Sequence, residues 1–176
     1  PNILVNNAGV YQGRTFHSAD QDFVDHMMQV NLGAVMQMCH AFIEKRRKKG
    51  GVIVNVSSIE AKSAFKSDMA IYAASKSAVL TLTKSLAREY AHEGFKVNVI
   101  VPGGVRTPGT AAVARNELRH FHLGIIGVGI RFAQRVPLGH FATPDDIARI
   151  ALVLATPLSD YLSGTEIVAD GGFLVA

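Results

Sequence analysis

The sequence predicts an α/β fold in which a doubly wound parallel sheet lies between two layers of helices. Short apolar runs rich in β-branched residues alternate along the chain with longer segments of helical periodicity. The runs lie far enough apart for right-handed crossovers between parallel strands. Polar or glycine-rich residues follow several of the runs, and the carboxyl ends of parallel strands are where ligands bind in such sheets.

Four apolar runs are the predicted strands, and three of them lead directly into polar or small residues. The first is followed by Asn7-Ala8-Gly9, the second by Ser58 and the third by Pro102-Gly103. Because carboxyl ends of parallel strands meet at one edge, we expect these residues to lie close together. The runs are residues 3–5, 52–57, 96–101 and 166–169.

The first predicted helix spans about residues 20–48. Ser18 with Gln21 forms a predicted capping box at its start. The basic run at residues 45–49 lies at its end, where cations complement the helix dipole and Gly50 permits a left-handed turn. We therefore interpret the run as a solvated helix end and expect no nucleic-acid partner.

Asn31 is a polar residue on the apolar stripe of this helix, in line with Val35, Met38 and Phe42. A buried amide is costly unless it is hydrogen-bonded. From the spacing alone, the favoured interpretation is an asparagine whose hydrogen bonds are satisfied at a helix kink.

The second predicted helix spans about residues 70–92 and has two distinct faces. Larger residues suit a surface against the sheet, and small residues on another face would let a second helix approach closely. That small face could be covered by a neighbour in the same chain or by another subunit. The larger residues are Val79, Leu82, Leu86 and Tyr90, and the small ones are Ala74, Ala78, Thr81 and Ser85.

The carboxyl-terminal part of the chain contains a long connection and one well-marked helix. Residues 107–136 form a long connection, and we expect a lid or binding loop there, because long connections in compact domains often have such a role. Thr143-Pro144 marks a helix start. The whole chain is then one domain, residues 1–176.

The residues from Ser58 to Lys76 predict a site that moves a proton. Tyr72 and Lys76 are four residues apart, so on a helix they project from one face. A cation beside the phenol is expected to lower its pKa toward the range of an acid/base catalyst. Ser58 could hold a carbonyl or hydroxyl group against that phenol.

Composition excludes several protein classes. Hydrophobic residues make up 48% of the 176 residues and charged residues 18%, which is typical of globular proteins and not of disordered ones. No apolar run is long enough to span a membrane. The single cysteine, Cys39, can form no internal disulfide, so we expect a reducing, cytoplasmic location. The sequence offers no convincing metal site.

Several motifs occur together and in order, and through them the chain resembles the short-chain dehydrogenase/reductase family. A single such motif is weak, but the set in register is specific. The resemblance implies a Rossmann-type fold and a hydride transfer between NAD or NADP and an alcohol or ketone. The motifs are Asn6-Asn7-Ala8-Gly9, Asn31, Ser58, Tyr72 with Lys76, residues 102–107 and Asp170-Gly171-Gly172.

The resemblance also implies roles for individual residues. Tyr72 would exchange a proton with the substrate oxygen, Lys76 would bind the nicotinamide ribose, and Ser58 would orient the carbonyl group. Asn31 would anchor a water molecule, which reverses the interpretation from spacing alone. The implied cofactor-binding residues are Asn7, Ala8, Gly9, Tyr72, Lys76, Pro102, Gly103, Val105 and Thr107. Residues 107–136 would be the substrate-binding loop, and the helices at about 20–48 and 70–92 would join subunits into a dimer or tetramer.

Three departures from the family pattern qualify these expectations. The first is His140, which stands where relatives often carry an arginine. The interval between Ser58 and Tyr72 is one residue longer than usual, which leaves open whether Ser57 or Ser58 points inward. The family's glycine-rich phosphate-binding turn and the residue that selects NAD or NADP would lie ahead of Pro1. We therefore expect a carboxyl-terminal portion of the fold whose first strand is an apolar edge. The alternative is a cofactor-incompetent member with a structural or assembly role.

Overall fold

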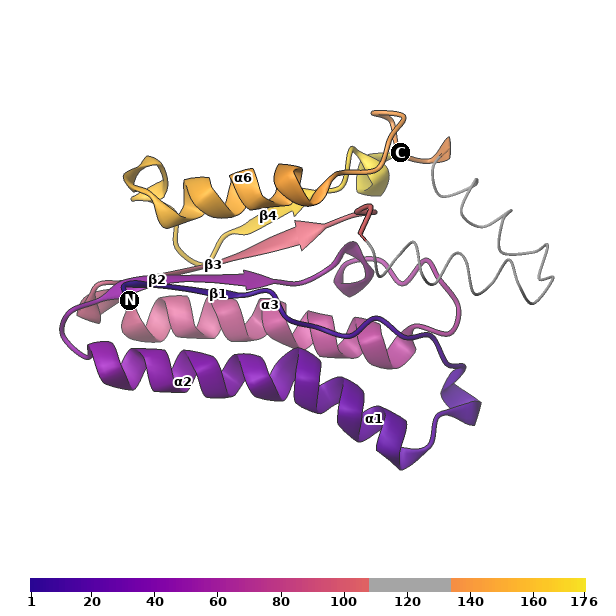
Figure 1. Cartoon of the computed structure of the whole chain (residues 1–176), viewed down its shortest axis with the longest axis horizontal. Coiled ribbons are helices and arrows are strands. Elements are labelled where there is room, and N and C mark those ends of the chain that lie inside the picture. The colour runs from indigo at the N-terminus through magenta and orange to yellow at the C-terminus, as the bar shows by residue number, and fades with distance from the viewer. Residues whose placement is uncertain (108–133) are drawn as a thin grey trace.

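A four-stranded parallel sheet is the centre of the molecule (Figure 1). The computed structural model describes residues 1–107 and 134–176. The strands lie in the order β1-β2-β3-β4, which is also their order along the chain, and every neighbouring pair is parallel. They are β1 (Ile3–Asn6), β2 (Gly51–Val56), β3 (Phe95–Pro102) and β4 (Glu166–Ala169). The predicted strands and the three-layer α/β fold are confirmed.

Helices cover both faces of the sheet (Figure 1). One face carries α2 (Ala34–Arg46) and α3 (Ala70–Tyr90). Helix α1 (Gln21–Met28) precedes α2 in the chain and lies beyond its amino-terminal end. The other face carries α6 (Pro144–Ala155), which begins with the predicted cap at Thr143, here a complete capping box. Side chains of β3 alternate between the layers: Val99 packs toward α3, whereas Ile100 packs with Leu154 of α6.

The first strand is an edge of the sheet, as expected. Within the described residues, β1 pairs with β2 and with no other strand. Ile3 and Val5 remain 38% and 45% exposed, although such residues are usually buried in parallel sheets. An exposed apolar edge of this kind is a surface on which a further strand can pair.

The segment predicted as one helix over residues 20–48 is interrupted by a π-helix, Gln29–Gly33. A π-turn holds more residues per turn than an α-helix and therefore rotates the faces that follow it. In the regular α2 that follows, the buried face runs through Val35, Cys39 and Phe42, and Met38 is 52% exposed beside it, so the predicted stripe is wrong at Met38. The predicted capping box is also wrong: Asp20 caps α1 by accepting from the Phe23 N–H group, 2.9 Å away.

Helix α2 ends within the basic run at residues 45–49, just before Gly50, as predicted. Gly50 has a φ of 64°, and a Cβ atom there would lie 2.3 Å from the Gly94 carbonyl oxygen, so only glycine fits. Part of the charge is paired within the chain, because the Arg47 guanidinium lies 2.8 Å from the Glu93 carboxylate.

The small-residue face of α3 is not covered by the described part of the chain. Ala74, Thr81 and Ser85 are exposed, and Ala78 is partly exposed. The larger residues pack toward the sheet as predicted, with Val79 fully buried.

None of the helices in the described residues is long and apolar enough to cross a membrane. Most of the predicted substrate-binding loop, residues 107–136, lies outside the described residues.

Candidate active site

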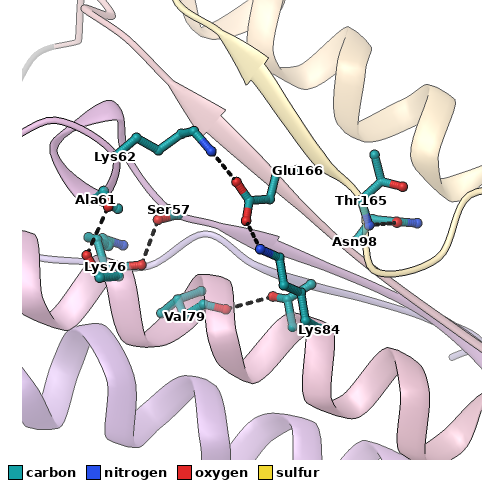
Figure 2. Close-up of polar contacts among 11 residues, drawn as sticks. Ser57, Ala61, Lys62, Lys76, Val79, Lys84, Asn98, Thr165 and Glu166 are labelled. Carbon is teal, nitrogen blue, oxygen red and sulfur yellow. Dashed lines mark hydrogen bonds and ion pairs between the residues drawn. The ribbon is translucent and has the colours of Figure 1, made fainter. Parts of the chain in front are cut away.

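Ser58 lies where β2 ends, at the sheet edge to which all four strands point (Figure 1). It caps a 3-10 turn, Ile59–Ala61, and its Oγ accepts a hydrogen bond from the Glu60 N–H group, 3.2 Å away. The preceding Ser57 is buried and donates to the Lys76 carbonyl oxygen at 2.8 Å (Figure 2). Ser57 therefore fixes the backbone of α3, and Ser58 is the residue whose hydroxyl group reaches Tyr72.

Tyr72 and Lys76 lie one turn apart on α3, as the spacing predicted, and both are largely buried. The Lys76 ammonium donates to the Val56 carbonyl oxygen, 3.1 Å away, at the end of β2. Burial lowers the pKa of Lys76 to about 8. The side chain is thus still a cation at neutral pH, with donors beyond the one that Val56 uses.

The expected low pKa of Tyr72 is not found. Burial is the largest cause and raises the pKa of Tyr72 to about 12, and the charges of Tyr11 and Glu60 act in the same direction. A hydrogen bond with Ser58 lowers it but does not compensate. The spacing argument considered only the cation at Lys76 and left out the loss of water around the phenol.

Asn31 is fully buried inside the π-helix and ties it to the loop after β1. Its side-chain oxygen accepts from the Val10 N–H group at 2.8 Å, and its amide nitrogen donates to the Val10 carbonyl oxygen at 3.0 Å. The same nitrogen lies 3.2 Å from the Ser75 hydroxyl oxygen on α3. The amide is therefore satisfied at a helix irregularity, in agreement with the interpretation from spacing alone.

Gly9 belongs to an exposed turn of small residues next to these groups. A Cβ atom on Gly9 would lie 3.1 Å from the Asn31 side-chain oxygen and 3.2 Å from the Lys76 ammonium nitrogen. Asn7 and Ala8 are exposed at the same turn. This open surface of small residues beside a cationic donor fits the hydroxyl-rich end of a nucleotide.

The segment after β3 is held close to the end of β4. The Gly103 N–H group donates to the Ala169 carbonyl oxygen at 2.9 Å, and a Cβ atom on Gly103 would lie 2.8 Å from the Asp170 Cα atom. Pro102 is buried at the end of β3. Val105 forms an isolated parallel bridge with Ala142, and Thr107 is partly buried beyond it.

The structure adds residues that sequence reasoning missed, chief among them Tyr11 and Glu60. The Tyr11 ring contacts the Tyr72 ring edge-on, with centroids 5.0 Å apart. The Lys66 ammonium lies 5.4 Å from the centre of the Tyr11 ring. Glu60 is 4% exposed even though it is a carboxylic acid. Its place two residues after Ser58 was the one available signal for its proximity to the site.

An ion-pair cluster anchors the turn after Ser58 to the last strand. Glu166 on β4 contacts Lys62, which follows the 3-10 turn, and Lys84 on α3, at 2.5 and 2.6 Å (Figure 2). These pairs lower the pKa of Glu166. Three segments distant in sequence are thereby joined around the turn that Ser58 begins.

Comparisons with known proteins agree with this geometry. A family model described as enoyl-(acyl carrier protein) reductase matches residues 1–174. The chain is 37% identical over 171 residues to the oxidoreductase UcpA of Salmonella typhimurium, and 34% identical to the 3-oxoacyl-[acyl-carrier-protein] reductase FabG of Chlamydia pneumoniae. In both cases the match covers 97% of this chain and 64% of the relative.

A similar solved structure is that of a putative 2-deoxy-D-gluconate 3-dehydrogenase from Agrobacterium tumefaciens with bound NADP. The TM-score is 0.89 with 31% sequence identity, over 99% of this chain and 68% of that one. The chain thus spans about two thirds of the length of the proteins that it matches. Nearly all of its own residues are included in each match.

Proposed function

Because the chain belongs to the short-chain dehydrogenase/reductase family, we propose that it is an oxidoreductase that uses NAD or NADP and acts on an alcohol or a ketone. The observation that carries this proposal is the convergence of Ser58, Tyr72 and Lys76 at the sheet edge, next to the open turn at Gly9. A site of this kind can exchange a proton with a substrate oxygen and offers a donor to a neighbouring nucleotide.

We propose that the nucleotide lies along the turn Asn7-Ala8-Gly9 and along the segment after β3. Pro102, Gly103, Val105 and Thr107 would contact its nicotinamide end. When bound, the nicotinamide supplies the hydride or accepts it. The small residues at both places leave room for a flat ring, and the NADP-bound relative of 31% identity supports this choice of cofactor.

Tyr72 has the protonation state required of the acid in ketone reduction. Its raised pKa, about 12, keeps the proton on the phenol at neutral pH, ready to pass to the oxygen of the substrate. The Ser58 hydroxyl group would hold that oxygen against the phenol. Lys76, a cation below its pKa of about 8, would stabilise the phenolate that remains.

For oxidation of an alcohol the same groups work in reverse. Tyr72 must then be a phenolate when it accepts the proton, and burial of the phenol opposes that form. Asn31 would hold the loop that carries Gly9 against Lys76, in addition to any water molecule that it anchors.

A direct assay tests the proposal. The reduced nicotinamide absorbance is followed with NADH and with NADPH against two panels, acyl ketones like the substrate named for the Chlamydia relative and keto acids of the gluconate type. We expect turnover with one cofactor and one panel. Binding of either nucleotide without turnover of any alcohol or ketone would contradict the proposal.

We further propose that α3 joins copies of this chain through its small-residue face, together with the segment from α1 to α2. The exposure of Ala74 and Thr81 supports an approach by another helix. Ala78→Trp should lower the mass measured by light scattering, and an unchanged oligomer would argue against this interface.

We also propose a cytoplasmic location, which suits the free, buried thiol of Cys39.

A further inference from the structure

We propose that Glu60 is a positioning residue of the same site, whose buried carboxyl group controls through its charge how readily the Tyr72 hydroxyl group releases its proton. The inference rests on the proposed function, in which Tyr72 is the acid and base. Glu60 itself touches no reacting atom in this account and acts through its electric field on the phenol.

The local backbone holds Glu60 in an unusual place for an acid. Its N–H group donates to the Ser58 hydroxyl oxygen, so the turn that presents Ser58 also directs the Glu60 side chain inward. The residue is 4% exposed. The N–H groups of Lys66 and Phe65 approach its carboxyl group and favour the charged form, but neither carboxyl oxygen has a hydrogen-bond partner of good geometry among the described residues. A carboxylate buried in this way is costly, and the group gains a proton instead.

Charged and titratable groups face Glu60 from three segments. Lys66 and Asp68 lie on the loop that leads to α3, Tyr11 lies on the loop after β1, and Tyr72 lies on α3. Burial raises the pKa of Glu60 to about 7, and the charge of Asp68 adds to this, whereas the Lys66 ammonium and the N–H groups of Lys66 and Phe65 oppose it. The carboxyl group therefore changes its charge near neutral pH.

The two phenols respond to that charge. Ionised Glu60 raises the pKa of Tyr72 and also that of Tyr11, whose ring is packed edge-on against the Tyr72 ring. When Glu60 loses its proton to solvent, the new negative charge disfavours the Tyr72 phenolate. Neutral Glu60 removes this opposition, so Tyr72 releases its proton more easily when Glu60 is protonated.

An NMR titration tests this coupling without any turnover. The protein is labelled with ¹³C at the tyrosine Cζ and glutamate Cδ atoms, and Tyr72→Phe identifies the Tyr72 resonance. We expect the Glu60 carboxyl to titrate near pH 7 and the Tyr72 resonance to move with the same midpoint. The step should vanish in Glu60→Gln and persist in Glu44→Gln, a matched change at an exposed glutamate.

A pH profile of kcat/KM for alcohol oxidation provides the second readout. Glu60→Gln should move its acidic midpoint to lower pH by on the order of half a unit, because the Gln side chain stays neutral. Loss of rate at all pH values without a shift of midpoint would indicate a merely structural role and overturn the inference.

The two tests separate the inference from the proposed function. A Glu60 carboxyl that titrates at the ordinary value for glutamate, or a Tyr72 resonance without the step, overturns the inference whatever the enzyme assay shows. An unshifted profile in an active enzyme also overturns it and leaves the proposed function intact. Absence of turnover with both cofactors overturns the proposed function, while the NMR step still reports the effect of Glu60 on Tyr72.

Discussion

The ring of Tyr11 stands edge-on against the ring of Tyr72, with an interplanar angle of 88° and ring centroids 5.0 Å apart. Aromatic pairs in this arrangement contribute beyond the area that they bury. The contact joins the loop after β1 to α3 and restricts the position of the phenol that is proposed to exchange a proton. Tyr11 is 42% exposed, so it also forms part of the surface next to that phenol.

Removing the Tyr11 ring should impair the site more than the fold. Tyr11→Ala is expected to lower kcat/KM by about fivefold, since an edge-on ring pair is worth about 1 kcal/mol and Tyr72 loses its lateral support. Tyr11→Phe keeps the ring and serves as the control, with kcat/KM expected to fall by less than about threefold. Steady-state kinetics distinguish the two. A phenylalanine variant as impaired as the alanine variant would assign the effect to the hydroxyl group.

A methyl group at Gly9 should displace Lys76. The added Cβ atom would lie 3.2 Å from the ammonium nitrogen and 3.1 Å from the Asn31 oxygen, both closer than ordinary contact. Gly9→Ala is expected to raise the KM for the nicotinamide nucleotide by about tenfold or more. Gly33→Ala is the matched control, because its Cβ atom would meet only the flexible Gln29 side chain. Equal effects of the two variants on KM would refute the placement of the nucleotide beside Gly9.

Asn31 should matter for stability before it matters for catalysis. Asn31→Leu leaves the Val10 N–H and carbonyl groups without the partners that now bind them at 2.8 and 3.0 Å. We expect the free energy of unfolding to fall by about 2–4 kcal/mol, as is typical when buried polar groups lose their hydrogen bonds. Urea denaturation measures it, with Asn7→Ala at an exposed position as the control. A loss below about 0.5 kcal/mol would show that these bonds add little to stability.

The Glu166 cluster should make stability depend on pH in the acidic range. Hydrogen bonds from Lys62 and Lys84 lower the pKa of Glu166, so its contribution is present above the unfolded pKa of about 4.3 and is lost as pH falls through the folded pKa. Glu166→Gln should cost about 1 kcal/mol at neutral pH and flatten the decline in acid. Thermal unfolding followed from neutral to acidic pH checks this. An unchanged acid slope would mean that other carboxylates dominate.

The strands, the sheet type and the helix starts at Thr143 and near Tyr72 were predictable because local periodicity carries them. The π-helix at Gln29–Gly33 was not, since nothing in the spacing of Asn31 and Phe42 reveals an extra residue in a turn. The prediction that Met38 faces the core was wrong for a different reason, because the buried face of α2 runs through Val35, Cys39 and Phe42 and leaves Met38 exposed. The choice of Asp20 over Ser18 as the cap depended on a 3-10 turn ahead of α1 that periodicity does not report.

Motif spacing predicted that Ser58, Tyr72 and Lys76 form one site but could not give the electrostatics of that site. The pKa of Tyr72 depends on how much water burial removes, and burial is a property of the whole fold. Tyr11 and Glu60 lie near Tyr72 because two loops distant in sequence meet there. No periodic pattern marks such a meeting, so these residues emerge only in three dimensions.

The most direct test of the proposed function is the turnover number of Tyr72→Phe. Phenylalanine keeps the ring beside Tyr11 and removes only the hydroxyl group that is proposed to exchange the proton. With the cofactor and substrate that the wild-type protein prefers, kcat should fall by about a thousandfold while thermal unfolding changes little. A variant that keeps a turnover number close to that of the wild type would contradict the assignment of Tyr72 as the acid and base.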